Sequence, residues 1–558
     1  MEDKRTLVAF LVIGLMLLLL PFYYEWMGLT APAPQPSSPQ EPTGRAVEGG
    51  EPARGVLPPQ QPTPGKPAEA PSAAAAAPGA VASGSRDIVV RTPLQELVFS
   101  TAGGVVTSCR LPGYRLVGGG VVELVPPAGR GLALSLEGQQ GSESLAQTEF
   151  WASHDSLAVP GGERAVLRMA AELGGGRRVE KVFTFHGDRY GFELELACEG
   201  VGDDTQLMVG WQGGIAATER DLQTDVREAR VLAYFNDNLT TVRTEDAGTT
   251  EEWRDKGSLQ WAGVRSKYFL LALATAGGER YSVALQGMGA GAEHMPDYSF
   301  EVGTQLQGGG RWPTLVYLGP LNYDSLRLHG ADLEQAIDFG WPVVRQVSQL
   351  LLIFFRAAYA YIPNYGWIIV VFAVAIKILV YPLTHKTYES TSRMQELQPK
   401  IAALRERYKS DPQRLSRETM KLYKEHGVNP LGGCLPLLLQ MPIFFALYNL
   451  FGKTIELRQA PFALWIDDLS VPDQVVVGGV GVHVLPLLMA VSMFVQQKMT
   501  MKDPKQAFLV YFMPIMMTFI FWNMTSGLVL YWTVFNVLTI GQQFLVDRLR
   551  QARSLRAG

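Results

Sequence analysis

Residues 367–383 read Trp-Ile-Ile-Val-Val-Phe-Ala-Val-Ala-Ile-Lys-Ile-Leu-Val-Tyr-Pro-Leu, an apolar run interrupted by one charge, at Lys377. Such a run predicts a transmembrane helix. A lysine at the centre of a membrane span costs roughly 2.5–3.5 kcal/mol on insertion scales, so it normally faces protein or a hydrated cavity. Snorkelling toward the nearby helix end at Pro382 is the structural alternative. Lys377 is therefore the first candidate functional residue.

Apolar runs elsewhere in the 558-residue chain predict a polytopic α-helical membrane protein with six spans. The first run fits either a cleavable signal peptide or a transmembrane helix. We interpret residues 1–30 as an uncleaved signal-anchor span, because the run is long for a signal peptide. The fifth run is short for a bilayer about 30 Å thick, which indicates either local thinning of the bilayer or a span that extends several residues beyond the run. The second span is expected at 362–383, and spans three to six lie within 429–546, at 431–451, 482–499, 508–522 and 527–546.

Charges in the connecting loops predict one orientation. Residues 384–428 carry ten Lys/Arg against six Asp/Glu, whereas residues 453–475 carry two basic and four acidic residues. The short tail, 547–558, is basic. Because positive loops stay in the cytoplasm, we expect both termini and residues 384–428 there, and the region between the first two spans on the opposite side.

The region between the first two spans divides by composition. Residues 31–86 are rich in Pro and Ala and cannot bury enough apolar surface to fold, which predicts a disordered linker. Residues 87–338 show short alternating strands, including a hairpin of 182–185 and 192–196, and predict an antiparallel β-sandwich. Residues 339–361 predict an amphipathic helix lying along the membrane interface; a separate membrane span is the alternative, which Pro342 and the polar residues of the segment disfavour.

Residues 384–428 predict a helical hairpin. Leu397, Ile401 and Leu404 follow helical spacing, and Asp411-Pro412 is typical of a helix start. The basic exterior of this hairpin could contact ribosomal RNA or anionic lipid, or simply be solvated.

The sequence offers no pattern for catalysis or for a cofactor. Gly452-Lys453-Thr454 lacks the earlier glycine of a nucleotide-binding loop, since Leu447 occupies that position. The histidines do not pair at metal-ligand spacing, and three cysteines predict no disulfide framework. The expected span interiors contain no Asp or Glu, which argues against a proton-coupled transporter. We therefore expect neither an enzyme nor a cofactor or metal site.

Polar uncharged residues occur within the expected spans. If several face inward with Lys377, they would line a hydrated groove; interhelical hydrogen bonding is the commoner alternative. These residues are Gln440, Asn449, Gln496, Asn523, Thr533, Asn536 and Gln542.

Several strings in the C-terminal half carry a family resemblance. They are Tyr381-Pro-Leu383, Leu397-Gln-Pro-Lys400, Asn429-Pro-Leu-Gly-Gly-Cys-Leu-Pro436, Gln440-Met-Pro-Ile-Phe444, Leu457-Arg-Gln-Ala-Pro-Phe-Ala-Leu-Trp465 and Ser526-Gly-Leu-Val-Leu-Tyr-Trp532. Over about residues 360–545 the chain resembles the YidC/Oxa/Alb family of membrane protein insertases. The preceding span, linker and β region resemble the layout of Gram-negative family members.

The resemblance implies a non-enzymatic insertase and membrane chaperone of the bacterial inner membrane, acting alone or with the Sec translocon. It implies nascent membrane proteins, membrane lipid and transiently the ribosome as partners. The implied fold is a periplasmic β-supersandwich beside a five-helix core that encloses a hydrophilic groove. The family's groove cation, usually arginine, falls on Lys377, its tyrosine pair on Tyr531 and Trp532, and other polar groove positions on Gln440 and Asn536.

Two departures alter the expected chemistry. Lysine keeps the charge but lacks the planar five-donor fork of arginine, so attraction of acidic tails is expected rather than bidentate recognition. Tryptophan at 532 keeps an aromatic contact without a phenolic hydroxyl. A lysine-dependent transporter and a structural scaffold for the translocon are the alternative functions.

Overall fold

The computed structural model describes residues 85–139, 141–202, 204–244, 246–276, 280–291, 293–305, 310–427, 435–500 and 507–557. The predicted signal-anchor span and nearly all of the predicted linker lie outside these residues, as does most of the Asn429–Pro436 string.

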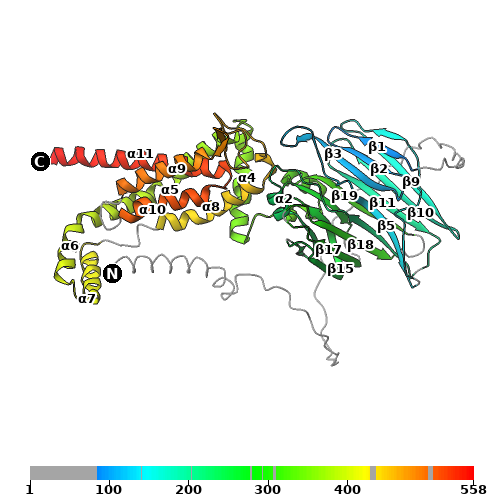
Figure 1. Ribbon diagram of the computed structural model, residues 1–558, viewed down its shortest axis with the longest axis horizontal. Helices are drawn as coiled ribbons and strands as arrows, with labels where there is room; N and C mark the ends of the chain where they lie inside the picture. Colours follow the sequence, from blue (N-terminus) through cyan, green and yellow to red (C-terminus); the bar gives the residue numbers. More distant parts are fainter. Residues whose placement is uncertain are drawn as a thin grey trace, which may run out of the picture. The chain divides into compact units, whose positions relative to one another are not determined.

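Strands dominate the first part of the described chain, where alternation of apolar and polar residues turns one side of each strand toward a core. Nineteen strands between Asp87 and Pro320 are joined by hydrogen bonds (Figure 1). They are β1 (Asp87–Arg91), β2 (Glu96–Ser100), β3 (Val105–Arg115), β4 (Val121–Glu123), β5 (Arg130–Gly138), β6 (Gly141–Ser144), β7 (Trp151–Ala152), β8 (Ser156–Ala158), β9 (Arg164–Gly174), β10 (Arg177–His186), β11 (Gly191–Glu199), β12 (Gln206–Gln212), β13 (Arg230–Phe235), β14 (Asn238–Val242), β15 (Thr250–Arg265), β16 (Phe269–Thr275), β17 (Arg280–Met288), β18 (Asp297–Gln305) and β19 (Arg311–Pro320).

Strand β15 links two sets of strands. Its first part, residues 250–258, pairs with β17, whereas its last part pairs with β13 and β16. The predicted hairpin is present as β10 and β11, with Phe183 opposite Leu194. The described strand pairs are antiparallel, as predicted, except for β1 and β8, which are parallel. These two strands are distant in sequence, so no tight turn constrains their direction.

The interior of the β domain is aromatic and aliphatic. Phe99, Phe183, Phe185 and Phe192 are almost fully buried, with ring centroids 4.8 to 6.3 Å apart. Truncating one such ring to alanine typically costs about 3–5 kcal/mol. Cys109 and Cys198 are buried free thiols, so the described part of this domain is held by packing and hydrogen bonds.

Helices dominate the chain after Leu321. Two short helices lie next to the β domain, α2 (Leu222–Glu228) between strands and α3 (Tyr323–His329) after them, followed by the 3-10 turn η1 (Leu333–Ala336). The remaining helical elements are α4 (Pro342–Tyr359), α5 (Tyr365–Glu396), α6 (Gln398–Arg407), α7 (Pro412–Glu425), α8 (Leu435–Lys453), η3 (Ile455–Leu457), α9 (Val484–Thr500), α10 (Ala507–Phe521) and α11 (Ser526–Ala557).

Helix α4 occupies the segment where an interfacial helix is predicted. It packs against α8, where Ser348 Oγ donates to the carbonyl of Ala446 at 3.4 Å. The other side of α4 exposes Leu350 and Ile353 by 67% and 60%. Apolar side chains left uncovered on an amphipathic helix suit the membrane interface.

Helices α5, α8, α9, α10 and α11 run alongside one another (Figure 1), and α11 contacts α5, α8 and α9. Among the described residues, two segments are long and apolar enough to cross a bilayer, Tyr365–Pro382 and Ser526–Val546. Val510–Phe521 is a shorter apolar helix. The six-span topology therefore stays a prediction.

Two of the predicted spans lie within longer helices. Helix α5 continues through Pro382 to Glu396, and α11 continues past residue 546 to Ala557. Hydropathy marks where a chain leaves the bilayer, but backbone hydrogen bonding can carry the helix on into water. Helices α6 and α7 then contact each other through Leu397 and Ile401, which pack against Leu422 and Tyr423.

A two-stranded ribbon between α8 and α9 is absent from the sequence-based expectations. It consists of β20 (Val475–Val477) and β21 (Val480–Val482), joined by Gly478 and Gly479 with φ of 60° and 85°. Two adjacent positive φ angles favour a Gly-Gly turn. The valines of the ribbon lie directly before a predicted span. In the sequence, their hydropathy is therefore hard to distinguish from the start of that span.

Candidate functional site

The ammonium of Lys377 on α5 is held by side chains of α11. Its Nζ donates to Thr539 Oγ1 at 2.7 Å and lies 4.7 Å from the ring centroid of Phe535. Lys377 is only 8% exposed, and no carboxylate among the described residues lies within ion-pair distance of it. A cation–π contact and a hydroxyl acceptor thus offset part of the cost of burying the charge.

Tyr531 lies two helical turns before Thr539 on the same side of α11. It is fully buried, and its hydroxyl accepts a hydrogen bond from Gln440 Nε2 at 3.2 Å. Its ring lies 5.9 Å from the rings of both Phe372 and Phe535. Phe535 therefore touches both Tyr531 and Lys377, and the structure brings Lys377, Tyr531 and Gln440 together from α5, α11 and α8.

Trp532 faces different neighbours from Tyr531. Its ring lies 5.4 Å from Phe444 on α8 and 5.6 Å from Phe521 on α10. Adjacent residues of an α-helix point about 100° apart, so the two aromatic residues do not share one surface. The predicted pair is thus divided between the Lys377 side and the α8–α10 side.

Asn536 serves a contact between helices. It is 5% exposed, and its Nδ2 donates to Ser492 Oγ on α9 at 3.4 Å. A similar bond, from Gln543 Nε2 to Thr500 Oγ1 at 2.9 Å, joins the same two helices farther along. Hydrogen bonds of this kind hold transmembrane helices together. The described hydrogen bond of Asn536 is therefore with α9 and not with Lys377.

Two further polar span residues have local partners. Asn449 Nδ2 donates to the carbonyl of Phe339 at 3.4 Å, and Thr533 Oγ1 donates to the carbonyl of Val529 in its own helix at 2.8 Å. Sequence reasoning missed Thr539 and Phe535, the direct neighbours of Lys377. Their signal was present, because residues 531, 535 and 539 recur at four-residue spacing and share one helix face.

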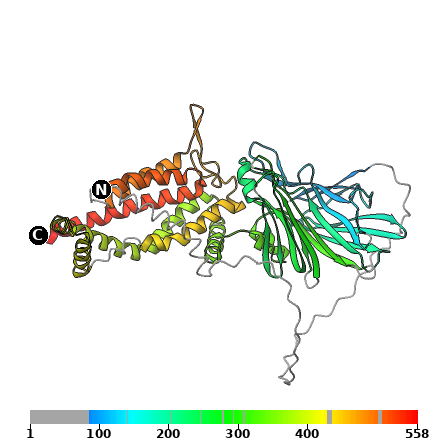
Figure 2. The same ribbon diagram turned by 60° about the horizontal axis from the view of Figure 1, so that its bottom comes forward.

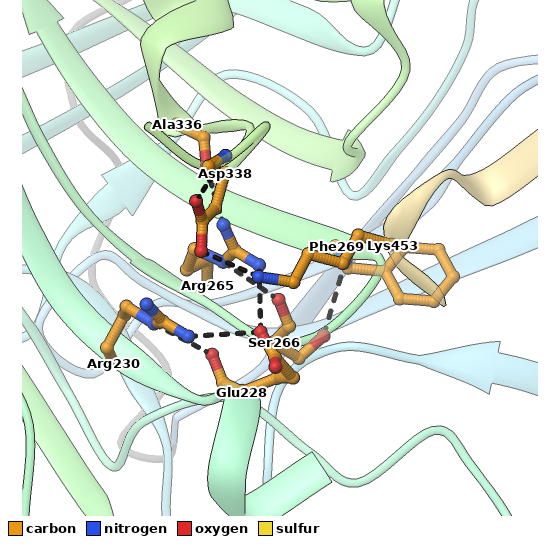
Figure 3. A network of polar contacts seen from close by, with 9 residues as sticks. Glu228, Arg230, Arg265, Ser266, Phe269, Ala336, Asp338 and Lys453 are labelled. Carbon is orange, nitrogen blue, oxygen red and sulfur yellow. Dashed lines mark hydrogen bonds and ion pairs between the residues drawn. The ribbon is translucent and has the colours of Figure 1, made fainter. Parts of the chain in front are cut away.

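A polar network joins the end of α8 to the β domain (Figure 3). Lys453 Nζ lies 2.7 Å from Asp338 Oδ2, and Glu228 Oε2 lies 3.0 Å from Arg230 and 3.5 Å from Arg265. Burial alone would raise the pKa of Asp338, but Lys453 beside it lowers that pKa below its ordinary value. The carboxylates are thus held in their charged form among three cations.

A second contact follows in the loop after α8. Arg458 Nε donates to Glu219 Oε1 at 2.7 Å, and Arg458 also donates to the carbonyl of Thr218 at 3.2 Å. Nearby, Asn322 donates to Glu456 Oε1 at 3.0 Å. The loop leading out of α8 is therefore bound to the β domain by several buried polar contacts.

Comparison with known proteins places this arrangement in a class. Residues 357–553 match the family described as 60Kd inner membrane protein, and residues 87–350 match the YidC periplasmic domain. Fold and sequence therefore indicate the class of inner-membrane proteins that combine a helical membrane region with a periplasmic β domain. The predicted β and helical regions agree with these two matches.

Relatives match nearly the whole chain. A membrane protein insertase YidC of Pelobacter propionicus is 36% identical, over 98% of this chain and 99% of that protein. A membrane protein insertase YidC of Geobacter metallireducens is 35% identical, over 98% of both chains. The solved structure of an active YidC insertase with its first transmembrane domain resolved covers 83% of this chain and 93% of that chain, at 19% identity and a TM-score of 0.37. On its family matches and these two relatives, the chain belongs to the YidC family.

Proposed function

We propose that this protein inserts integral proteins into the inner membrane and assists their folding, without catalysing a covalent reaction. The supporting observation is the position of Lys377, a nearly buried cation between α5 and α11 with no described carboxylate partner. Membership of a family whose relatives bear the name membrane protein insertase supports the same function. A cation that lacks a neighbouring carboxylate in an apolar setting attracts an acidic segment strongly, because the local dielectric constant is low.

The proposed substrate path follows Lys377, Gln440 and Tyr531, with Trp532 on the adjoining side. Lys377 attracts acidic residues of a nascent tail, while Tyr531 and Trp532 offer aromatic contact to its apolar segment. Tyr531 is fully buried at present. Separation of α5 from α11 is therefore part of the proposal, and it would create the hydrophilic groove. Asn536 would enter that groove only if α9 also moved from α11.

A short helix favours this route. The described part of helix α10 has 15 residues, about 22 Å at 1.5 Å per residue, against a hydrocarbon thickness of about 30 Å. A thinner bilayer beside α10 shortens the polar tail's path. The client's apolar segment then leaves sideways into lipid, driven by removal of its apolar surface from water.

The proposed topology has six spans, cytoplasmic N- and C-termini and a periplasmic region 87–338. The predicted cytoplasmic region 384–428 and basic tail 547–558 would meet the ribosome transiently, and cooperation with Sec components is part of the same proposal. Reporter fusions within 384–428 and 453–475 should report opposite sides of the membrane. The same side for both would contradict the topology.

Photocrosslinking tests the substrate path. A photoreactive residue at Gln440, Tyr531 or Trp532 should capture a ribosome-stalled membrane protein. Val537, 55% exposed on α11, is the matched control for a position on another side of the same helix. Adducts at Val537 but at none of the three site positions would refute the path. Solute flux across liposomes that contain only this protein, if abolished by Lys377→Ala, would instead favour a transporter. A structural scaffold would show neither crosslinks at the three site positions nor solute flux.

A further inference from the structure

The β20–β21 ribbon is an apolar projection that the proposed insertion path does not use. Residues 474–483 read Gln-Val-Val-Val-Gly-Gly-Val-Gly-Val-His and contain no acidic or permanently charged side chain. Val475 pairs with Val482 and Val477 with Val480. Because directly opposed residues share one face of a ribbon, these four valines form a single apolar face. Val477 and Val480 are 63% and 64% exposed, and Val476 on the other face is 69% exposed.

The base of the ribbon is tied firmly to the start of α9. Asp473 is only 5% exposed. Its carboxylate accepts hydrogen bonds from Trp465 Nε1 at 3.0 Å and from the Leu485 backbone N–H at 2.8 Å. His483 adds a hydrogen bond between its ring and the Asp473 carbonyl. These hydrogen bonds fix the base of the ribbon to the start of α9. The side chain of Asp473 also accepts from a backbone N–H of the first turn of α9 that has no partner within the helix.

The ribbon lies next to a predicted membrane boundary. Strand β21 ends at Val482 and α9 begins at Val484, so the ribbon is continuous with a predicted span. Figure 2 shows it projecting sideways from the end of the neighbouring helices rather than along their length. The His483 ring lies 4.8 Å from the ring of Trp522, and tryptophans are enriched at membrane–water interfaces.

We propose that the β20–β21 ribbon is a lipid-binding element that rests its valine face in the outer leaflet of the bilayer. Valine side chains gain free energy on leaving water, whereas the open strand edges still need water as a hydrogen-bond partner. Both needs are met at the boundary between headgroups and acyl chains. A protein-binding hot spot would be expected to carry Trp, Tyr or Arg, which residues 474–482 lack.

The proposal needs α9 to cross the bilayer but is independent of insertase activity. Its test is full-length protein in vesicles of phosphatidylethanolamine and phosphatidylglycerol, with a photoreactive residue at position 477 or 480. Irradiation should yield lipid adducts at both positions, detected by intact mass. A probe at Asn238, which is exposed on β14 of the β domain, should give no lipid adduct. A probe at Phe519, which is 77% exposed on α10, gives the amount of lipid adduct expected of a lipid-facing position.

A paired variant tests whether the valine face drives the contact. With the probe at 480, Val477→Asp should abolish the lipid adduct, whereas Val477→Leu should retain it. Adducts at 477 and 480 no more abundant than at 238 would overturn the proposal. So would crosslinks to a second protein or another copy of this chain in place of lipid, or an unchanged adduct in Val477→Asp.

Discussion

Arg458 and Glu219 form an ion pair of 2.7 Å between side chains that are 2% and 6% exposed, although they stand 239 positions apart in the chain. Arg458 lies in the loop after α8, and Glu219 precedes α2 of the β domain. Burial raises the pKa of Glu219, and the charge of Arg458 opposes that rise. The pair therefore couples the helical region to the β domain.

Removing one member of this pair should destabilise the protein more than removing both. Arg458→Met leaves a buried carboxylate without its cation, and breaking such a pair typically costs about 3–5 kcal/mol. Chemical unfolding of the detergent-solubilised protein should show an earlier transition for Arg458→Met than for Arg458→Met with Glu219→Leu. The exposed pair Arg86–Asp155 provides the control, since surface pairs contribute about 0–1 kcal/mol. Equal transitions for the single and double variants would show that the pair is not coupled.

Lys181 should make the stability of the β domain depend on pH. It is fully buried, and burial lowers its pKa to about 7 from 10.5. Its Nζ donates to the carbonyls of Gly103, Gly104 and Leu132 at 2.8 to 3.0 Å. Between these two pKa values the unfolded chain binds more protons than the folded one, so stability should rise as the pH increases from about 7 toward 10.5.

The Lys181 contribution is isolated by comparison with Lys181→Met. As the pH rises from about 7 toward 10.5, the unfolding midpoint of the wild type should increase relative to that of Lys181→Met. His154, an exposed residue of the same domain, offers the control substitution His154→Gln, which should leave the profile unchanged. A pH-independent difference would mean that the three carbonyls keep the ammonium charged in the fold.

The charge of Lys377 should matter more than its geometry. Lys377→Arg keeps the cation and should support insertion, whereas Lys377→Glu should impair insertion of clients with acidic tails by repulsion. Insertion into vesicles, measured by protease protection of the translocated tail, checks both variants. A client with a neutral tail is the control and should be less affected. Equal insertion by the two variants would remove electrostatic attraction from the mechanism.

Thr539 should stabilise the buried ammonium of Lys377. Thr539→Val preserves the shape but removes the hydroxyl that accepts from Lys377 Nζ. Loss of a hydrogen bond to a charged group costs about 1.5–3 kcal/mol, which should appear as an earlier unfolding transition. Thr533→Val is the matched control, because the described bond of Thr533 is to the backbone of its own helix. Similar effects in both variants would argue against a specific role of Thr539.

Much of the helical arrangement could be read from local patterns. The run around Lys377 predicts a span, and the structure places a helix there; Pro342 begins α4 within the segment expected at the interface. The neighbours of Lys377 could not be identified this way. Thr539 lies 162 residues later, and only the packing of α5 against α11 selects it over other polar residues.

The sequence alone determined the alternating strands, the apolar helices and the single charge at Lys377, because these depend on periodicity and composition along a short stretch of chain. The tertiary structure alone decided that Tyr531 joins Lys377 through Phe535 while Trp532 turns toward α10, and that Arg458 meets Glu219. Partners distant in the chain are chosen by how whole helices and sheets pack, since packing depends on the shapes of both surfaces at once.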